Sequence, residues 1–312
     1  MKPILYPMLS PQLRQQRLMP PKTMVRVVLD TDAFNEVDDQ FAMAYLLRSS
    51  ERANVMAITA APFYNWNSSS PEDGMNKSYY EIHKIFDLMG ETMHPPVFKG
   101  STQYMQSVNG PLDSSAADEI IRLALASPMD DPLYVISIGA VTNISSAIVQ
   151  CPQIIQHMVV VWLGPNAYWW KDHNIFNVSQ DYLASSVIYE SGVPLVILPC
   201  HCVASHLHTN PYELDACLKH KNRLCDYFCD LFHGRHARFG NNEPGWSKVL
   251  WDVSTIAWLV NDQWVPSKFL PTPMLRPDFT YEVDPKRDVY REAVFIDRSK
   301  VFADMFKKLS LS

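Results

Sequence analysis

The sequence predicts an α/β fold: a single Rossmann-like domain with a mostly parallel, doubly wound sheet and extra C-terminal elements. Short runs of β-branched and apolar residues recur along the 312 residues, and stretches with helical spacing lie between them. Hydrophobic residues make up 47% of the chain, enough to fill a sizeable core. Strands that are apolar throughout and alternate with helices are typical of a parallel sheet covered on both faces.

Five apolar runs are predicted as strands: Met24–Asp30, Val55–Ala60, Leu133–Ile138, His157–Leu163 and Pro194–Leu198. The helices predicted with them cover about residues 39–49, 75–89, 115–127, 142–150 and 181–191. Ligands of such sheets gather at the carboxyl ends of the strands. Functional residues are therefore expected just after each run.

The two ends of the chain add further elements. Residues 1–23 form an N-terminal extension, and the Pro-rich, partly strand-like segment 264–298 is expected to cover one end of the domain. Three further helical segments are predicted: Pro211–Arg238, Val253–Val260 and Val301–Leu309. We find no repeat or linker, so residues 1–312 are expected to form one domain.

Composition excludes several classes of partner. Lys and Arg number 27 against 33 Asp and Glu, a net charge of −6, so no cationic face for nucleic acid is expected. The N-terminus lacks the order of a signal peptide, and no window approaches the roughly 18 apolar residues of a membrane span. We therefore expect a cytoplasmic protein without a membrane partner.

The six cysteines are expected to be thiols in a reducing compartment. The densest group is Cys200-His201-Cys202, followed by His206 and His208. Its spacing matches no common structural zinc pattern, and it follows an apolar strand directly. Packing and loop roles are the favoured interpretation of these residues.

The most informative segment joins the first strand to the first helix of the sheet. It holds five carboxylates: Asp30, Asp32, Glu36, Asp38 and Asp39. Crowded carboxylates raise one another's pKa, and a hard cation with oxygen ligands relieves the repulsion. Capping of the helix near Asp38 is the alternative, but it accounts for only one or two of these acids.

Four separated segments resemble the inosine–uridine-type, calcium-dependent nucleoside hydrolase family. In order along the chain they are Asp30-Thr31-Asp32 with Asp38-Asp39, the Gly-x-x-Thr-Asn sequence that ends at Asn143, Phe176-Asn177 with Asp181, and Trp251-Asp252. The acidic loop is two residues longer than the commonest form of the family. The agreement in order makes the resemblance much more specific than any single motif.

The resemblance implies hydrolysis of the N-glycosidic bond of ribonucleosides to free base and ribose by a calcium-bound water, with Asp32 as general base. It implies Ca²⁺ ligands at Asp32, Asp39, the backbone carbonyl of Ile138 and Asp252. It implies substrate contacts at Asp38, Asn177, Asn166 and Trp251. Carboxylates, a carbonyl and a cis-diol can supply the six to eight oxygens that calcium takes, and magnesium is the second choice. Relatives are commonly homodimers or homotetramers, and the same is expected here.

The chain departs from the family pattern at two positions. Ile175 stands where many relatives have a Glu that helps to hold the ribose. Either His173 or Asn174 replaces that Glu, or the substrate lacks the hydroxyl, or activity is weakened. Trp251 stands where some relatives have a histidine that protonates the leaving base.

Two aromatic stretches accompany these departures. The loop 166–170, together with Trp251, offers an aromatic surface on which a purine could stack. An equally favoured interpretation is that these aromatic side chains fill the core or a subunit contact. The segment 63–67 falls at the expected site edge, where it either binds substrate or folds as a loop.

Two other functions are compatible with parts of the sequence. A haloacid-dehalogenase-type phosphatase also ends a strand with Asp-x-Asp, but Phe34 stands where that motif has Thr or Val. A catalytically weak homologue that binds a nucleoside or sugar is kept open by Ile175. Release of free base from nucleosides, or of phosphate from phosphomonoesters, separates these alternatives.

Overall fold

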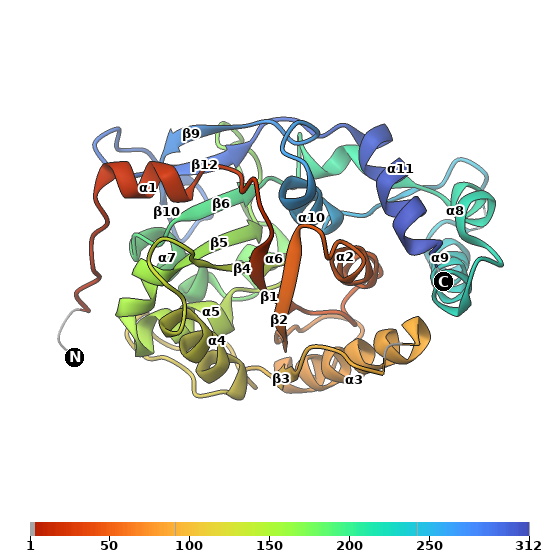
Figure 1. Cartoon of the computed structure of the whole chain (residues 1–312), viewed down its shortest axis with the longest axis horizontal. Helices are drawn as coiled ribbons and strands as arrows, with labels where there is room; N and C mark the ends of the chain where they lie inside the picture. The colour runs from red at the N-terminus through yellow and green to blue at the C-terminus, as the bar shows by residue number, and fades with distance from the viewer. Residues whose placement is uncertain (1–3, 91, 242, 312) are drawn as a thin grey trace.

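The computed structural model of the protein describes residues 4–90, 92–241 and 243–311. Its centre is an eight-stranded sheet with the order β3-β2-β1-β4-β5-β6-β12-β9 (Figure 1). These strands are β1 (Val25–Thr31), β2 (Ala53–Ala60), β3 (Val97–Lys99), β4 (Leu133–Ser137), β5 (Met158–Leu163), β6 (Leu195–Leu198), β9 (Ser267–Pro271) and β12 (Val289–Ala293). Neighbours pair in parallel except β9, which is antiparallel to β12. The predicted mostly parallel sheet is confirmed.

Helices cover both faces of the sheet (Figure 1). One face packs against α2 (Asp38–Leu47), α3 (Pro71–Met89), α8 (Pro211–Leu218), α9 (Arg223–Phe239), α10 (Val253–Val260) and α11 (Arg298–Leu309). The other face packs against α4 (Ser115–Leu125), α5 (Thr142–Gln150) and α7 (Tyr182–Glu190). Because strand side chains alternate, Val27 and Leu29 join the first core and Val28 joins the second. The doubly wound arrangement explains why the strands read as apolar throughout.

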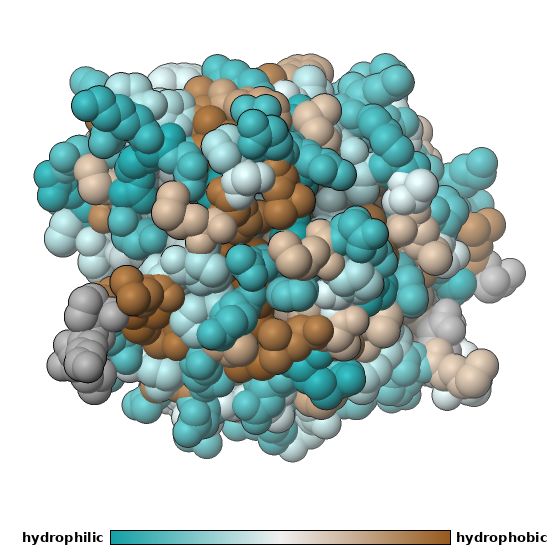
Figure 2. All heavy atoms as spheres, turned by 60° about the vertical axis from the view of Figure 1, so that its left-hand side comes forward, coloured by the Kyte–Doolittle hydropathy of each residue, from teal (hydrophilic) through white to brown (hydrophobic). Residues whose placement is uncertain are grey.

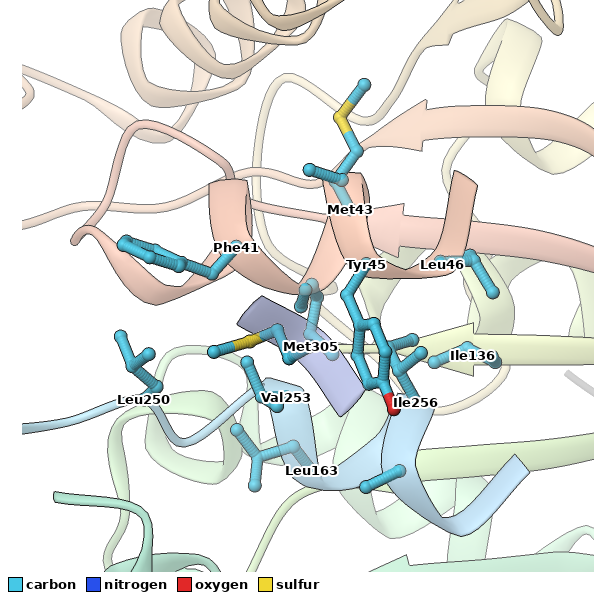
Figure 3. Packing of buried hydrophobic residues seen from close by; sticks show 14 of the residues in the cluster. Phe41, Met43, Tyr45, Leu46, Ile136, Leu163, Leu250, Val253, Ile256 and Met305 are labelled. Carbon is cyan, nitrogen blue, oxygen red and sulfur yellow. The ribbon is translucent and has the colours of Figure 1, made fainter. Parts of the chain in front are cut away.

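Helix α2 lies in the middle of the first core, and its pairing with α10 positions the site described below. Figure 3 shows Tyr45 of α2 beside Ile256 of α10, with Met305 of α11 alongside. Residues 38–46 of α2 are all buried. Burial on every side explains why this helix lacks a polar stripe.

The order of strands reverses direction between β1 and β4. From β1 the chain adds β2 and β3 on one side, and it then crosses to place β4 on the other side of β1. Ligands of open α/β sheets bind in the crevice outside the carboxyl ends of the strands at such a switch point. The acidic loop after β1 and Ile138 after β4 both lie there.

The N-terminal extension docks on the opposite edge of the sheet. Helix α1 (Pro11–Arg17) is capped by the Ser10 side chain. Its buried arginines donate to backbone carbonyls, Arg14 to Gly192 at 2.6 Å and Arg17 to Met129 at 2.7 Å. Both acceptors precede strands, so the extension covers amino ends and leaves the carboxyl crevice open.

The C-terminal part differs from the prediction in two places. The segment 264–298 contributes β9 and β12 to the main sheet, in addition to the hairpin of β10 (Met274–Leu275) and β11 (Tyr281–Glu282). The predicted helix Pro211–Arg238 is two helices, α8 and α9. The chain breaks at His220, which has a left-handed backbone (φ 63°), and the Asn222 side chain caps α9.

The described helices include none that is long and apolar enough to cross a membrane. Figure 2 shows one side of the molecule, where hydrophobic patches alternate with larger hydrophilic areas. Leu5, 88% exposed, and Met8, 82% exposed, are apolar side chains of the extension that remain in contact with solvent. The expected homodimer or homotetramer stays a prediction, since the structure holds a single chain.

Candidate metal and ligand site

Asp30, the first acid of the loop, has a structural role. Its carboxylate accepts hydrogen bonds from Thr59 Oγ1 at 2.6 Å and Asn143 Nδ2 at 2.8 Å. Burial raises the pKa of Asp30 to about 6, although these two bonds lower it. Asp30 therefore ties β1 to β2 and to the start of α5.

The Gly-x-x-Thr-Asn segment has a related role. Thr142 donates to Asp181 at 2.8 Å, and Asp181 also caps α7 by accepting from Ala184 N at 3.0 Å. Asn143 accepts from Ser101 N at 2.8 Å besides donating to Asp30. The motif thus fixes the loops around the crevice.

Three carboxylates converge at the crevice: Asp38, Asp39 and Asp252. One oxygen from each lies within 4.8 Å of the other two, and all three residues are buried. Asp38 and Asp39 occupy the first turn of α2, and Asp252 is the residue before α10. The two packed helices therefore point their N-termini, with their partial positive charge, at the same acidic cluster.

The predicted approach of Asp39 to Asp252, across more than 200 residues of sequence, is present in the structure. The third member of this group is Asp38, whereas the sequence prediction placed Asp38 on the sugar and Asp32 on the ion. Asp38 already has other partners, because it accepts from Trp251 N at 3.1 Å and lies 3.6 Å from the Lys248 ammonium.

Asp32 lies beside this group. Both of its carboxylate oxygens are buried without a hydrogen-bond donor, and its neighbours Asp39, Asp38 and Asp30 are themselves acids. Burial first, and then these charges, raise the pKa of Asp32 well above its ordinary value. Gly139 permits this placement, since a Cβ there would lie 3.1 Å from Asp32 Cγ.

The same causes act on the other two ligand candidates. Burial and the charge of Asp38 raise the pKa of Asp39 to about 7, although Thr31 Oγ1 donates to it at 2.5 Å. Burial and the neighbouring acids also raise the pKa of Asp252. Buried carboxylates with lone pairs that no donor satisfies are the environment that a bound cation stabilises.

The donor set fits the predicted ion. Every candidate ligand atom is an oxygen, which suits a hard cation such as Ca²⁺ rather than zinc. The backbone carbonyl of Ile138 accepts from Asn177 Nδ2 at 3.1 Å, and a carbonyl oxygen has a second lone pair for an ion. Asn177 Nδ2 also donates to Leu163 O at 3.0 Å, which fixes the amide at the crevice.

A cavity of about 410 Å³ opens above the acidic cluster. Its walls come from the segments after β1, β2, β4, β5 and β6 and from the start of α10. The residues that line it are Asn35, Glu36, Asp38, Asp39, Asn65, Trp66, Ile138, Leu163, Ile175, Phe176, Asn177, Cys200, His201, Trp251 and Asp252. A volume of this size accommodates a small ligand.

Two predicted substrate contacts have different surroundings. Trp251 lines the cavity, as the sequence predicts. Asn166 is not one of the described residues that line the cavity. Its side-chain amide donates to Asp172 O at 2.7 Å and accepts from His201 N at 3.1 Å. Asn166 therefore holds the loop after β5 against the segment after β6.

The Ile175 position is in the cavity wall, next in sequence to Phe176 and Asn177. Neither proposed replacement for the missing Glu lines the cavity. The His173 ring is fully buried and stacks on Tyr281 at 3.6 Å, and Asn174 is exposed outside it. The wall at this point is therefore apolar.

The sequence interpretation missed His201 and left the roles of Asn65 and Trp66 open. All three line the cavity. The Cys200 thiol donates to Gly164 O at 3.2 Å in a packing role, as predicted, while the neighbouring His201 ring is exposed at the cavity. In the sequence, only their positions after β2 and β6 indicated that these residues would reach the cavity, because the carboxyl ends of parallel strands meet at one edge of the sheet.

The fold and the crevice define an α/β protein with an acidic, oxygen-rich ligand site at the switch point of its sheet. Residues 27–304 match the family model described as inosine-uridine preferring nucleoside hydrolase, and the chain belongs to that family of enzymes. This match decides against the phosphatase alternative.

Individual relatives are distant. The non-specific ribonucleoside hydrolase RihC of Escherichia coli is 27% identical over 160 residues, and the match spans 50% of this chain and 50% of the relative. Two solved structures share the fold. A plant nucleoside hydrolase, PpNRh1, has a TM-score of 0.74 at 16% identity, covering 94% of this chain and 100% of its own. The purine-preferring ribonucleoside hydrolase from Gardnerella vaginalis has a TM-score of 0.70 at 20% identity, covering 91% and 98%.

Proposed function

We propose that the protein hydrolyses the N-glycosidic bond of ribonucleosides, giving free base and ribose, with Ca²⁺ as cofactor. The observation that carries this proposal is the cluster of Asp38, Asp39 and Asp252 beneath a cavity of about 410 Å³, with the donor-free carboxylate of Asp32 beside it. Asp32, Asp39, Asp252 and the Ile138 carbonyl would hold the ion. A bound Ca²⁺ would polarise a water molecule and supply coordination sites for the two vicinal hydroxyls of ribose.

Asp32 accepts the proton of the attacking water. No donor satisfies its buried carboxylate, and burial raises its pKa, which favours uptake of a proton. Cleavage of the C1′–N bond builds positive charge on the sugar, and the neighbouring carboxylates stabilise that charge. Asp38 and Asn177 orient the sugar, since Lys248 and Trp251 N fix Asp38 while two backbone carbonyls fix Asn177.

The aromatic groups stand at the mouth of the cavity. Trp66 is 48% exposed, and Trp251 and His201 are edge to face with ring centroids 6.0 Å apart. A planar base held between such rings gains stacking energy of about 0.5–1.5 kcal/mol per ring pair. This arrangement supports binding of the sugar below and of the base above.

The test is a panel of purine and pyrimidine ribonucleosides incubated with the protein and Ca²⁺, with release of free base and of reducing sugar both measured. We expect both products in equal amounts, and their loss with a chelator. A phosphomonoester panel in parallel should release no phosphate.

The weakly active binding homologue is the second candidate, and Ile175 in the cavity wall is the observation that favours it. Calorimetric binding of a nucleoside without release of base would establish that alternative.

A further inference from the structure

His201 faces the same cavity as Trp251 but comes from a different part of the chain. It follows β6, and its ring is exposed at the cavity wall. The ring stacks on Trp170 at 5.5 Å with an interplanar angle of 21°, and it meets Trp251 edge to face at 6.0 Å. Asn166 accepts a hydrogen bond from its backbone N–H at 3.1 Å. Two tryptophans and one amide therefore define where this imidazole lies.

The other titratable groups of the cavity wall have partners of their own. The three clustered aspartates face one another, and Glu36 pairs with the Lys248 ammonium. Asn65 donates to the side chain of Asn35 at 2.5 Å. By contrast, neither ring nitrogen of His201 forms a hydrogen bond with any residue that the structure describes.

We propose that His201 is the proton donor to the leaving base, an assignment that rests on the proposed hydrolase function. When the C1′–N bond breaks, its electron pair stays on the base nitrogen, and the protonated imidazole gives its proton to a ring nitrogen of the base. The attacking water gives its hydroxyl to C1′ and its other proton to Asp32. The products are neutral base and ribose, after which Asp32 releases its proton to solvent and the exposed His201 takes one up.

The location of His201 suits this role. Its aromatic neighbour Trp251 lines the same cavity as the clustered carboxylates and offers a face on which a base would stack, while Trp170 packs against the imidazole. The assignment requires the acid for the leaving group, His201, and the acceptor for the water proton, Asp32, to act on opposite sides of the scissile bond. Trp251 is the residue before Asp252. The His201 imidazole lies beside the Trp251 ring and comes from the segment after β6.

The experiment compares two leaving groups in two variants. His201→Phe keeps an aromatic ring for the contacts with Trp170 and Trp251 but removes the proton donor. His206→Phe is the matched control, because that histidine packs against Phe295 and does not line the cavity. The substrates are the best nucleoside of the panel and 4-nitrophenyl β-D-ribofuranoside, whose phenolate leaves without a proton.

We expect His201→Phe to lower kcat for the nucleoside by at least about a hundredfold and to change kcat for the nitrophenyl riboside by less than about threefold. His206→Phe should match the wild type on both. An equal fall on both substrates, or an unchanged nucleoside rate, overturns the assignment while leaving the hydrolase function in place. If the wild type cleaves only the nitrophenyl riboside, the site holds the sugar and His201 is not an acid. If it cleaves neither, the proposed function and this assignment both fail.

Discussion

The Lys248 ammonium lies 3.6 Å from Oδ1 of Asp38 and also pairs with Glu36. The Lys248 side chain is only 13% exposed. Burial by itself lowers the pKa of Lys248, but the charges of Asp38 and Glu36 outweigh it and raise the pKa. Lys248 therefore brings a positive charge to the rim of an acidic site, on β8 (Lys248–Val249), a few residues before Asp252.

Lys248→Met should destabilise the protein by about 3 kcal/mol, because removing one partner of a buried ion pair leaves the other charge uncompensated. The measurement is the free energy of unfolding in urea. Lys300→Met is the control, since its pair with Asp297 is exposed at 61% and 32% and contributes under about 1 kcal/mol. Equal effects of the two substitutions would show that the Lys248 pair behaves as a surface pair.

Asp32→Asn should lower turnover of nucleosides by at least about a hundredfold, because the amide keeps the size of the side chain but cannot accept the water proton. The protein should still fold, since no donor in the structure depends on the Asp32 carboxylate. Calorimetry should show that Ca²⁺ still binds, with reduced affinity. Unchanged turnover with Ca²⁺ bound would remove Asp32 from the role of base.

Calcium should stabilise the protein more as pH rises. The pKa values of Asp30 and Asp39 are raised to about 6 and about 7 from an ordinary 3.8, so without metal the folded state holds protons that the unfolded state has released. The stability of chelator-treated protein should thus fall as pH rises from about 4 to about 7. Ca²⁺ binds the ionised carboxylates and offsets this loss.

Thermal unfolding with Ca²⁺ and with chelator, between pH 5 and pH 8, measures this dependence. The difference in Tm should widen toward pH 8. A difference that is constant with pH would mean that the raised pKa values of the cluster are not linked to the ion.

Ile175→Glu should raise kcat/KM for ordinary ribonucleosides about ten- to a hundredfold. Ile175 lines the cavity next to Asn177, and a hydrogen bond from a sugar hydroxyl to a charged group contributes about 1.5–3 kcal/mol. Ile175→Met is the control, since it keeps the wall apolar. Deoxy-nucleosides that lack the hydroxyl facing this position should gain nothing. A lower Tm without any kinetic gain would mean that the side chain serves the core instead.

Sequence alone could locate the acidic cluster because its signals are local. Asp38 and Asp39 follow a strand within one loop, and the position of Asp252 before an apolar helix completes the pattern. The division of roles between Asp32 and Asp38 is not local. It depends on Trp251 and Lys248, which reach Asp38 from more than 200 residues away.

The same reasoning explains the other differences. His201 was interpreted as a loop residue because its contact with the cavity requires β6 to lie next to β5, which no short motif records. Strand β12 was not separated from its Pro-rich surroundings because it contains Arg291 and Glu292. Both residues are buried, and both side chains are satisfied by hydrogen bonds. Arg291 donates to Ser267 at 2.7 Å, and Glu292 accepts from Tyr290 at 2.5 Å.

The longer acidic loop depends on partners from distant parts of the chain. Asn35 is bound by Asn65 at 2.5 Å and by Asn67 at 2.8 Å, and Arg235 of α9 donates to its carbonyl at 3.4 Å, while Glu36 is bound by Lys248. A longer loop without these partners would leave buried polar groups unsatisfied. We therefore expect the longer loop and these partners to occur together. Across homologues, these positions should be gained and lost together, and grafting the loop alone into a shorter-looped relative should yield a less stable protein.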